Sequence, residues 1–456
     1  MWIYILIRLF NKKHTLEGDE LRHLACAKNF YKLWNKSFYD LHPPLYSWLI
    51  KQFLRVTRDY QAGVIVSLLC SIGLYFVCLC LYDMLGLNVY QKAIAMIFLT
   101  FNYTLIYYSN RIFRYQLIAL LGTAMLYFLL IHKVFLGGLC WGLLALTCSF
   151  AGLRAFWIWI VTGLNPFALI PFGFCYGGWL WKKASVYCKH DYYPSGIDGK
   201  IEPVWNFTFK QLISPLYFPW TYSYYGKREL GYDLKAWPKK ICGMFGLYFT
   251  KHRWLNKGIG LAGIILGILT IKGMLSSSLW LVVLTLALLW PSLYKRFLPR
   301  NSIIAIPLIG YFLAKEVCVI PFQWANLGFW LFGFGFLCLN RAFILSRPKI
   351  KTLATSSFLN NLPKDGILVE GLIAYPIAYR SHKRIVVIPH EPDKLLARQQ
   401  VNLSINKFDL HYAVFSELYK TELHLGYPAI EYIKSFELLN TIKEDDDIYY
   451  IYEVKK

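Results

Sequence analysis

The residues best able to do chemistry lie near the start of the chain, in two short groups. The first is Gly18-Asp19-Glu20, followed by Ala25 and Ala27 in a helix-like run, and the second is His42-Pro43-Pro44-Leu45-Tyr46. One carboxylate can take a proton from a hydroxyl group while another positions or neutralises a nearby cation. Adjacent side chains on a helix diverge by about 100°, so Asp19 and Glu20 cannot share one proton. We expect them to divide these two roles.

Both groups also have an ordinary structural interpretation. Acidic residues in the first turn of a helix cap it and face the positive end of its dipole. Proline is common in a first turn because the N–H that it lacks would be unpaired there anyway, and His42 would then lie at the level of the lipid headgroups. The composition of the surrounding chain helps to distinguish the two interpretations.

That surrounding chain has the composition of a polytopic membrane protein. Of its 456 residues, 57% are hydrophobic and only 16% are charged, and its apolar runs approach the length that crosses a bilayer. An acidic residue in such a setting costs about 2.5 to 3.5 kcal/mol on insertion scales, so those that remain are candidates for function. The expected spans are 62–82, 93–109, 115–131, 134–151, 155–181, 258–273, 276–294, 301–318 and 322–340.

The span 155–181 decides on which side of the membrane the later segments lie. Gly163-Leu164-Asn165-Pro166 predicts either a kink or a turn between two half-length helices. If the loop 11–41 is placed on the extracytoplasmic side, a turn gives about eleven helices and puts the loop 182–257 and the C-terminal part on that side too. The long loop holds 13 Lys+Arg against 5 acids, which favours the cytoplasm, but long loops follow the charge rule poorly. Met1–Phe10 is too short to span, so either the true start lies upstream or this helix is incomplete.

Charge and texture divide the chain into two domains. Residues 1–349 hold 36 Lys+Arg against 12 Asp+Glu and form the expected transmembrane domain, whereas residues 350–456 hold 13 against 14. The second part has the pattern of a small soluble α/β domain. Because the basic residues are spread over loops between apolar spans, we expect anionic lipid rather than nucleic acid as the partner. Strands are expected at 367–369, 384–388, 412–415 and 448–452, and helices at 372–380, 391–401 and 428–435.

In order and spacing, the two opening groups resemble the first-loop motif of the polyprenyl-phosphate-dependent C-type glycosyltransferases. This membrane superfamily includes protein O-mannosyltransferases and the lipid A aminoarabinose transferases. Three further stretches are similar to the same family: Ser109–Leu117, Tyr294–Pro299 and Ala378–Pro389. The chain departs from the pattern at Tyr115-Gln116, where some relatives place an aspartate after the second-loop arginine.

The resemblance implies an integral membrane glycosyltransferase that moves a sugar from a polyprenyl-phosphate donor to an acceptor hydroxyl on the extracytoplasmic face of a bacterial inner membrane. Asp19 would be the general base and Glu20 the second catalytic acid, and preorganised cations would stabilise the leaving phosphate. Some relatives also use a divalent cation, although two carboxylates alone make a weak metal site. The acceptor stays open between lipid, glycan and protein. The substrate-binding candidates are His42, Tyr46, Arg111, Arg114 and Arg296.

Two other classes of function compete with this interpretation. A transporter or flippase for a lipid-linked or anionic solute would also contain broken helices and charges at membrane depth. A membrane scaffold whose soluble tail binds a partner would need no catalytic residue at all. The ordinary structural interpretation of Arg111, Arg114 and Arg296 is that each is a positive-inside residue or extends its charged end to the membrane surface.

Overall fold

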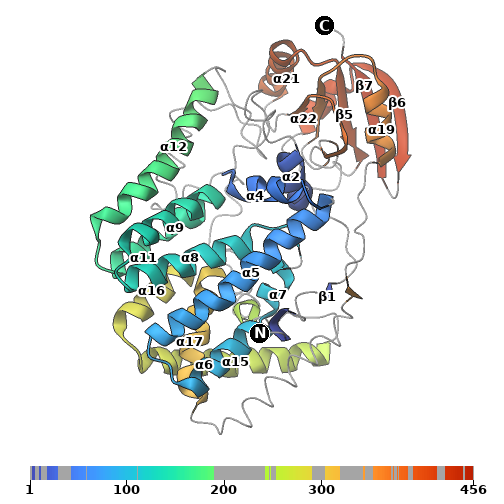
Figure 1. Ribbon diagram of the computed structural model, residues 1–456. Coiled ribbons are helices and arrows are strands. Elements are labelled where there is room, and N and C mark those ends of the chain that lie inside the picture. The colour runs from blue at the N-terminus through green and yellow to red at the C-terminus, as the bar shows by residue number, and fades with distance from the viewer. Residues whose placement is uncertain are drawn as a thin grey trace.

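The structure is a computed structural model of the whole chain. It places the described residues in a helical bundle with a separate β-sheet unit at one end, seen at the top of Figure 1. The described residues are 3–5, 10–11, 18–28, 43–57, 59–109, 111–188, 242–245, 247, 253–289, 303–318, 343–344, 353–370, 373, 377, 379–388, 394–417, 427–444 and 447–454.

The bundle is arranged around one long apolar helix, α5 (Asp59–Met84). Among the described residues it is the only helix long and apolar enough to cross a membrane, and five shorter apolar helices accompany it. It packs against α6, α7 and α8, while α8 packs on α9 and α9 on α12. The other helices of the bundle are α6 (Val89–Phe101), α7 (Tyr103–Ser109), α8 (Tyr115–Leu130), α9 (Val134–Thr147), α10 (Ser149–Arg154), α11 (Phe156–Val161), α12 (Leu169–Cys188), α15 (Arg253–Leu275), α16 (Leu279–Leu289) and α17 (Ile306–Val317).

The span expected at 155–181 is two helices joined by a turn. Gly163 and Leu164 have φ values of 103° and 54°, which lie in the left-handed region and end α11. Asn165 then caps the short 3-10 helix Pro166–Ala168 by accepting a hydrogen bond from the Phe167 N–H at 3.1 Å. Of the two alternatives for this span, the turn is therefore the one found.

The span expected at 93–109 is also broken, at Asn102 between α6 and α7. The Asn102 amide donates to the carbonyl of Met244 at 3.0 Å, and the Thr104 hydroxyl donates to that of Gly243 at 2.8 Å. Both partners lie in residues 242–245, a short buried segment of the stretch expected to be a polar loop. At the break, the Asn102 side chain thus binds this remote segment through its amide group, and its oxygen also accepts the N–H of Leu105 at 3.3 Å, at the start of α7.

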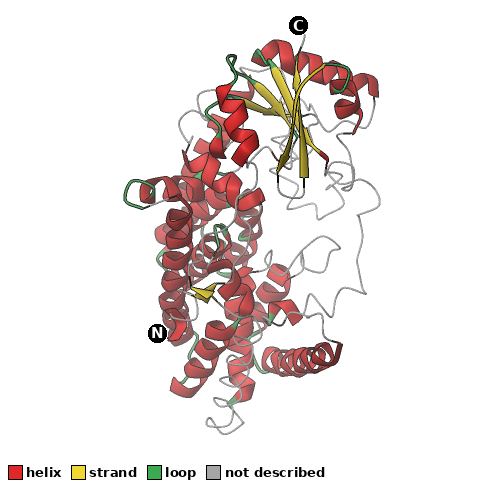
Figure 2. Cartoon of the chain, turned by 90° about the vertical axis from the view of Figure 1, so that its right-hand side faces the viewer, coloured by secondary structure: helices red, strands yellow, loops and turns green. Residues whose placement is uncertain are grey.

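The C-terminal part contains a five-stranded mixed sheet in the order β4-β3-β5-β7-β6. β3 runs parallel to β4 and β5, whereas β7 runs antiparallel to β5 and β6. One face of the sheet packs on α21 and α22 and the other on α19, as Figure 2 shows. The elements are α19 (Leu353–Asn361), β3 (Ile367–Val369), β4 (Ile385–Val387), α21 (Lys394–Phe408), β5 (Tyr412–Ser416), α22 (Tyr427–Ile433), β6 (Glu437–Glu444) and β7 (Asp447–Glu453).

Two short helices lie where the sheet unit meets the bundle in Figure 1. α2 (Gly18–Lys28) and α4 (Leu45–Phe53) pack on each other, and α4 also packs on α5. The ammonium group of Lys28 lies 4.0 Å from the centre of the Tyr379 ring, which joins α2 to the sheet unit. At another point β1 (Phe10–Asn11) pairs antiparallel with β2 (Phe343–Ile344) and brings the beginning of the chain to residues near the end of the bundle.

Candidate functional site

The candidate site is built where α2 meets the turn between α7 and α8. Glu20, in the first turn of α2, is fully buried, and its Oε1 accepts a hydrogen bond from the N–H of Ile112 at 3.1 Å. Its Oε2 lies 4.0 Å from Nη1 of Arg111. A buried carboxylate is costly unless it is paired and hydrogen-bonded, and Glu20 has both kinds of partner. α2 and the turn between α7 and α8 are thus joined through one acidic side chain.

Arg111 is held on a second side by an aromatic ring. Its guanidinium carbon lies 4.2 Å from the centre of the Tyr107 ring on α7, a distance at which the negative face of the ring attracts a cation. The side chain is 11% exposed. The carboxylate and the ring together restrict the guanidinium to one region, so that it is a preorganised positive charge.

Tyr46 supports the same turn from α4. It is buried, and its hydroxyl lies 2.7 Å from the hydroxyl oxygen of Ser67 on α5. Burial raises the pKa of the Tyr46 phenol well above its ordinary value, so the phenol keeps its proton and can donate it. The hydroxyl of Ser67 donates in turn to the carbonyl of Arg111 at 2.8 Å.

The structure therefore brings three of the residues singled out in the sequence into one cluster: Glu20, Tyr46 and Arg111. Arg114 is near them, as the N-cap residue of α8, and is partly exposed. The backbone of Asp19 lies in the first turn of α2, but its side chain is outside the described part, as are His42 and Arg296.

Three further residues are candidates for function that the sequence did not predict: Ser67, Tyr107 and Arg154. Ser67 and Tyr107 contact the Arg111 turn directly. Arg154, in α10, is 6% exposed although it lies within the bundle. A charge buried among apolar helices is a candidate for function. Arg154 is the only charged residue between Val134 and Val161, and this isolation was the signal that could have found it.

Metal ligands do not gather in the described part of the chain, where no group of three or more His, Cys, Asp or Glu residues could hold an ion. Both oxygens of Glu20 already face protein groups.

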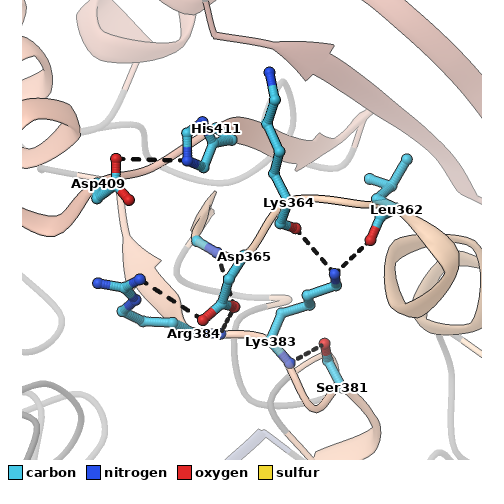
Figure 3. A network of polar contacts seen from close by, with 9 residues as sticks. Leu362, Lys364, Asp365, Ser381, Lys383, Arg384, Asp409 and His411 are labelled. Carbon is cyan, nitrogen blue, oxygen red and sulfur yellow. Dashed lines mark hydrogen bonds and ion pairs between the residues drawn. The ribbon is translucent and has the colours of Figure 1, made fainter.

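A second polar network lies in the sheet unit, at the starts of β3 and β4 (Figure 3). Asp365 accepts hydrogen bonds from the N–H groups of Gly366 at 2.9 Å and Arg384 at 2.7 Å, and the Arg384 guanidinium lies 3.6 Å away. Burial alone would raise the pKa of Asp365, but these hydrogen bonds and the neighbouring cations lower it overall. Lys383 donates to the carbonyls of Leu362 and Lys364. These contacts link the turns that precede β3 and β4.

Of the three comparisons made with known proteins, the one with solved structures found matches. No protein-family model and no curated protein matches the sequence. Among solved structures, the chain is similar to ArnT from Cupriavidus metallidurans in the apo state, with a TM-score of 0.60 and 11% identity over 99% of this chain and 96% of that one. ArnT from the same organism bound to undecaprenyl phosphate matches with a TM-score of 0.50, the same identity and the same coverage. The resemblance expected from the sequence is confirmed at the level of the fold.

Proposed function

We propose that this protein is an integral membrane glycosyltransferase that moves a sugar from a polyprenyl-phosphate donor to an acceptor hydroxyl on the extracytoplasmic face of a bacterial inner membrane. The observation that carries the proposal is the fold, which is shared over nearly the whole chain with an ArnT that was solved with undecaprenyl phosphate. The cluster of Glu20, Arg111 and Tyr46 supports it, because buried charges are rarely retained near a membrane without a role.

In the proposed reaction the acceptor oxygen attacks the anomeric carbon of the sugar. The bond from that carbon to the phosphate oxygen breaks, and the polyprenyl phosphate leaves with the electron pair. Asp19 takes the proton of the acceptor hydroxyl as the new bond forms. Glu20 does not reach the substrate in this scheme. It holds the charge of Arg111 in place.

The leaving phosphate gains negative charge as the bond breaks, and a fixed cation stabilises that charge without having to reorganise. Arg111 is suited to this role, since its guanidinium is restricted by Glu20 and Tyr107. Arg114 lies in the same turn and can add a second positive charge. We assign His42 and Arg296 to substrate binding on the family resemblance alone.

The test is sugar transfer from a radiolabelled polyprenyl-phosphate sugar in membranes that contain the wild type or Asp19→Asn. The proposal expects transfer by the wild type and a loss of at least about a hundredfold in the variant. Asp83→Asn is the matched control, because Asp83 lies exposed near the opposite end of α5, where it pairs with Lys92. The control should transfer sugar at the wild-type rate.

The outcomes separate the proposal from its alternatives. Equal transfer by the wild type and Asp19→Asn would remove Asp19 from the role of base while keeping the enzyme. Absence of transfer from every polyprenyl-phosphate sugar, together with movement of such a lipid across vesicle membranes, would instead identify a flippase.

A further inference from the structure

The peptide group between Arg111 and Ile112 is held at both of its ends. Its carbonyl, from Arg111, accepts the hydrogen bond of the Ser67 hydroxyl at 2.8 Å. Its N–H, from Ile112, donates to Glu20 at 3.1 Å. Ser67 and Glu20 are both fully buried, so water does not compete for either bond. This peptide group sets the direction in which the Arg111 side chain leaves the backbone.

The hydrogen bonds on the carbonyl side form a chain with one direction. A serine hydroxyl has a single proton, and in Ser67 this proton goes to the Arg111 carbonyl, whereas the Phe113 carbonyl is more distant at 3.4 Å. The Ser67 oxygen then accepts the proton of Tyr46 at 2.7 Å. Tyr46 is 1% exposed, and its hydroxyl lies closer to Ser67 than to the Gly63 carbonyl at 3.5 Å, so its hydrogen bond orients the serine.

Apolar packing one helical turn earlier on α5 completes the contact. Gly63 precedes Ser67 by four residues and so lies on the same face of the helix. A Cβ atom at Gly63 would lie 2.5 Å from Cγ2 of Ile112. The absence of a side chain at Gly63 is thus what admits the side chain of Ile112, which is 1% exposed.

We propose that Ser67, oriented by Tyr46, is a positioning residue that fixes the Arg111 guanidinium where the leaving phosphate develops its charge. This inference rests on the proposed function and deepens it, since it assigns the alignment of the cation to α5 and α4. The contacts that carry this inference are local: Gly63 leaves room for Ile112, the Ser67 hydroxyl binds the Arg111 carbonyl, and Glu20 binds the Ile112 N–H and faces the guanidinium.

The predicted effect of losing the serine hydroxyl is kinetic. An error of about 1 Å in the placement of a catalytic group can cost about a hundredfold in rate. Arg111 acts on charge that exists only in the transition state, so the loss should appear in kcat with KM almost unchanged. A serine that contributed only to folding would lower the melting temperature without changing kcat relative to KM.

The experiment compares Ser67→Ala with Ser71→Ala. Both serines are fully buried on α5, but the Ser71 hydroxyl lies 2.9 Å from that of Tyr4, away from the Arg111 turn. We expect kcat to fall about ten- to a hundredfold in Ser67→Ala and to stay within about twofold of the wild type in Ser71→Ala. Tyr46→Phe should also lower kcat, but by a smaller factor than Ser67→Ala.

A double-mutant cycle with Arg111→Lys gives the decisive measurement. In this cycle Arg111→Gln is run beside Arg111→Lys, since lysine keeps a positive charge; if Ser67 acts through the charge of Arg111, its removal should have much less effect on kcat in the Arg111→Gln background. Equal fold-losses in the wild-type and Arg111→Gln backgrounds would overturn the inference, as would equal kinetics of Ser67→Ala and Ser71→Ala, while leaving the proposed function intact. A wild type that transfers no sugar would overturn the proposed function and the inference with it.

Discussion

Substitution of Glu20 by glutamine tests the buried charge pair most directly. Glutamine keeps the size of the side chain and can still accept the N–H of Ile112, but it removes the negative charge that lies 4.0 Å from the Arg111 guanidinium. At that distance, two unit charges interact by about 4 kcal/mol when the effective dielectric constant is about 20. This is an upper bound, because desolvation opposes it. We expect a net coupling of about 1 to 3 kcal/mol.

The assay is a thermodynamic cycle of Glu20→Gln, Arg111→Gln and the double variant, measured as unfolding free energy in detergent and as sugar transfer. Glu20→Gln should lower transfer about ten- to a hundredfold, since about 1.4 kcal/mol corresponds to a factor of ten. Glu20→Asp is the control that keeps the charge on a shorter side chain, and it should be intermediate. Additive stability effects, or wild-type transfer by Glu20→Gln, would refute the argument that this carboxylate holds the cation.

Two further predictions concern parts of the chain outside the site. Asn102→Ala should destabilise the protein by about 1 to 3 kcal/mol, because the carbonyl of Met244 loses its donor; thermal unfolding in detergent checks this, and a change below about 0.5 kcal/mol would contradict it. Asp365 has a lowered pKa in the folded protein, so it contributes stability above its unfolded pKa and loses this contribution as the pH falls through its folded pKa. Asp365→Asn should therefore lower the melting temperature at neutral pH, by an amount that shrinks on acidification, and a pH-independent difference would argue against the lowered pKa.

Hydrophobic patterns in the sequence predicted the helices and strands whose formation depends on residues close together in the chain. The long apolar run at 62–82 is α5, and the strands expected at 367–369 and 412–415 are β3 and β5. Hydrophobic period and β-branched content are sufficient for such segments. β6 was not predicted. All eight of its residues are exposed or half-buried, so this edge strand shows little of the hydrophobic signal on which the prediction depends.

Contacts between distant residues account for what was missed. At the break, Asn102 binds the carbonyl of Met244, and the helix pattern around it gives no sign of that partner. The acidic role of Glu20 was inferred from the first-loop motif, but its pairing with Arg111 crosses about ninety residues of sequence and follows from the packing of α2 on α5. Ser67 was hidden for a related reason, because one serine in an apolar helix is ordinary until its acceptor is known.

The pairing of β1 with β2 constrains the order in which the protein folds during its synthesis. Phe10 and Asn11 find their hydrogen-bonding partners at Ile344 and Phe343, which leave the ribosome only after almost all of the bundle has been made. Since chains emerge from the amino end first, β1 cannot pair with β2 until residues 343–344 have been synthesised. Closure of this small ribbon is thus a late event in assembly, and a chain arrested before residue 343 would lack it.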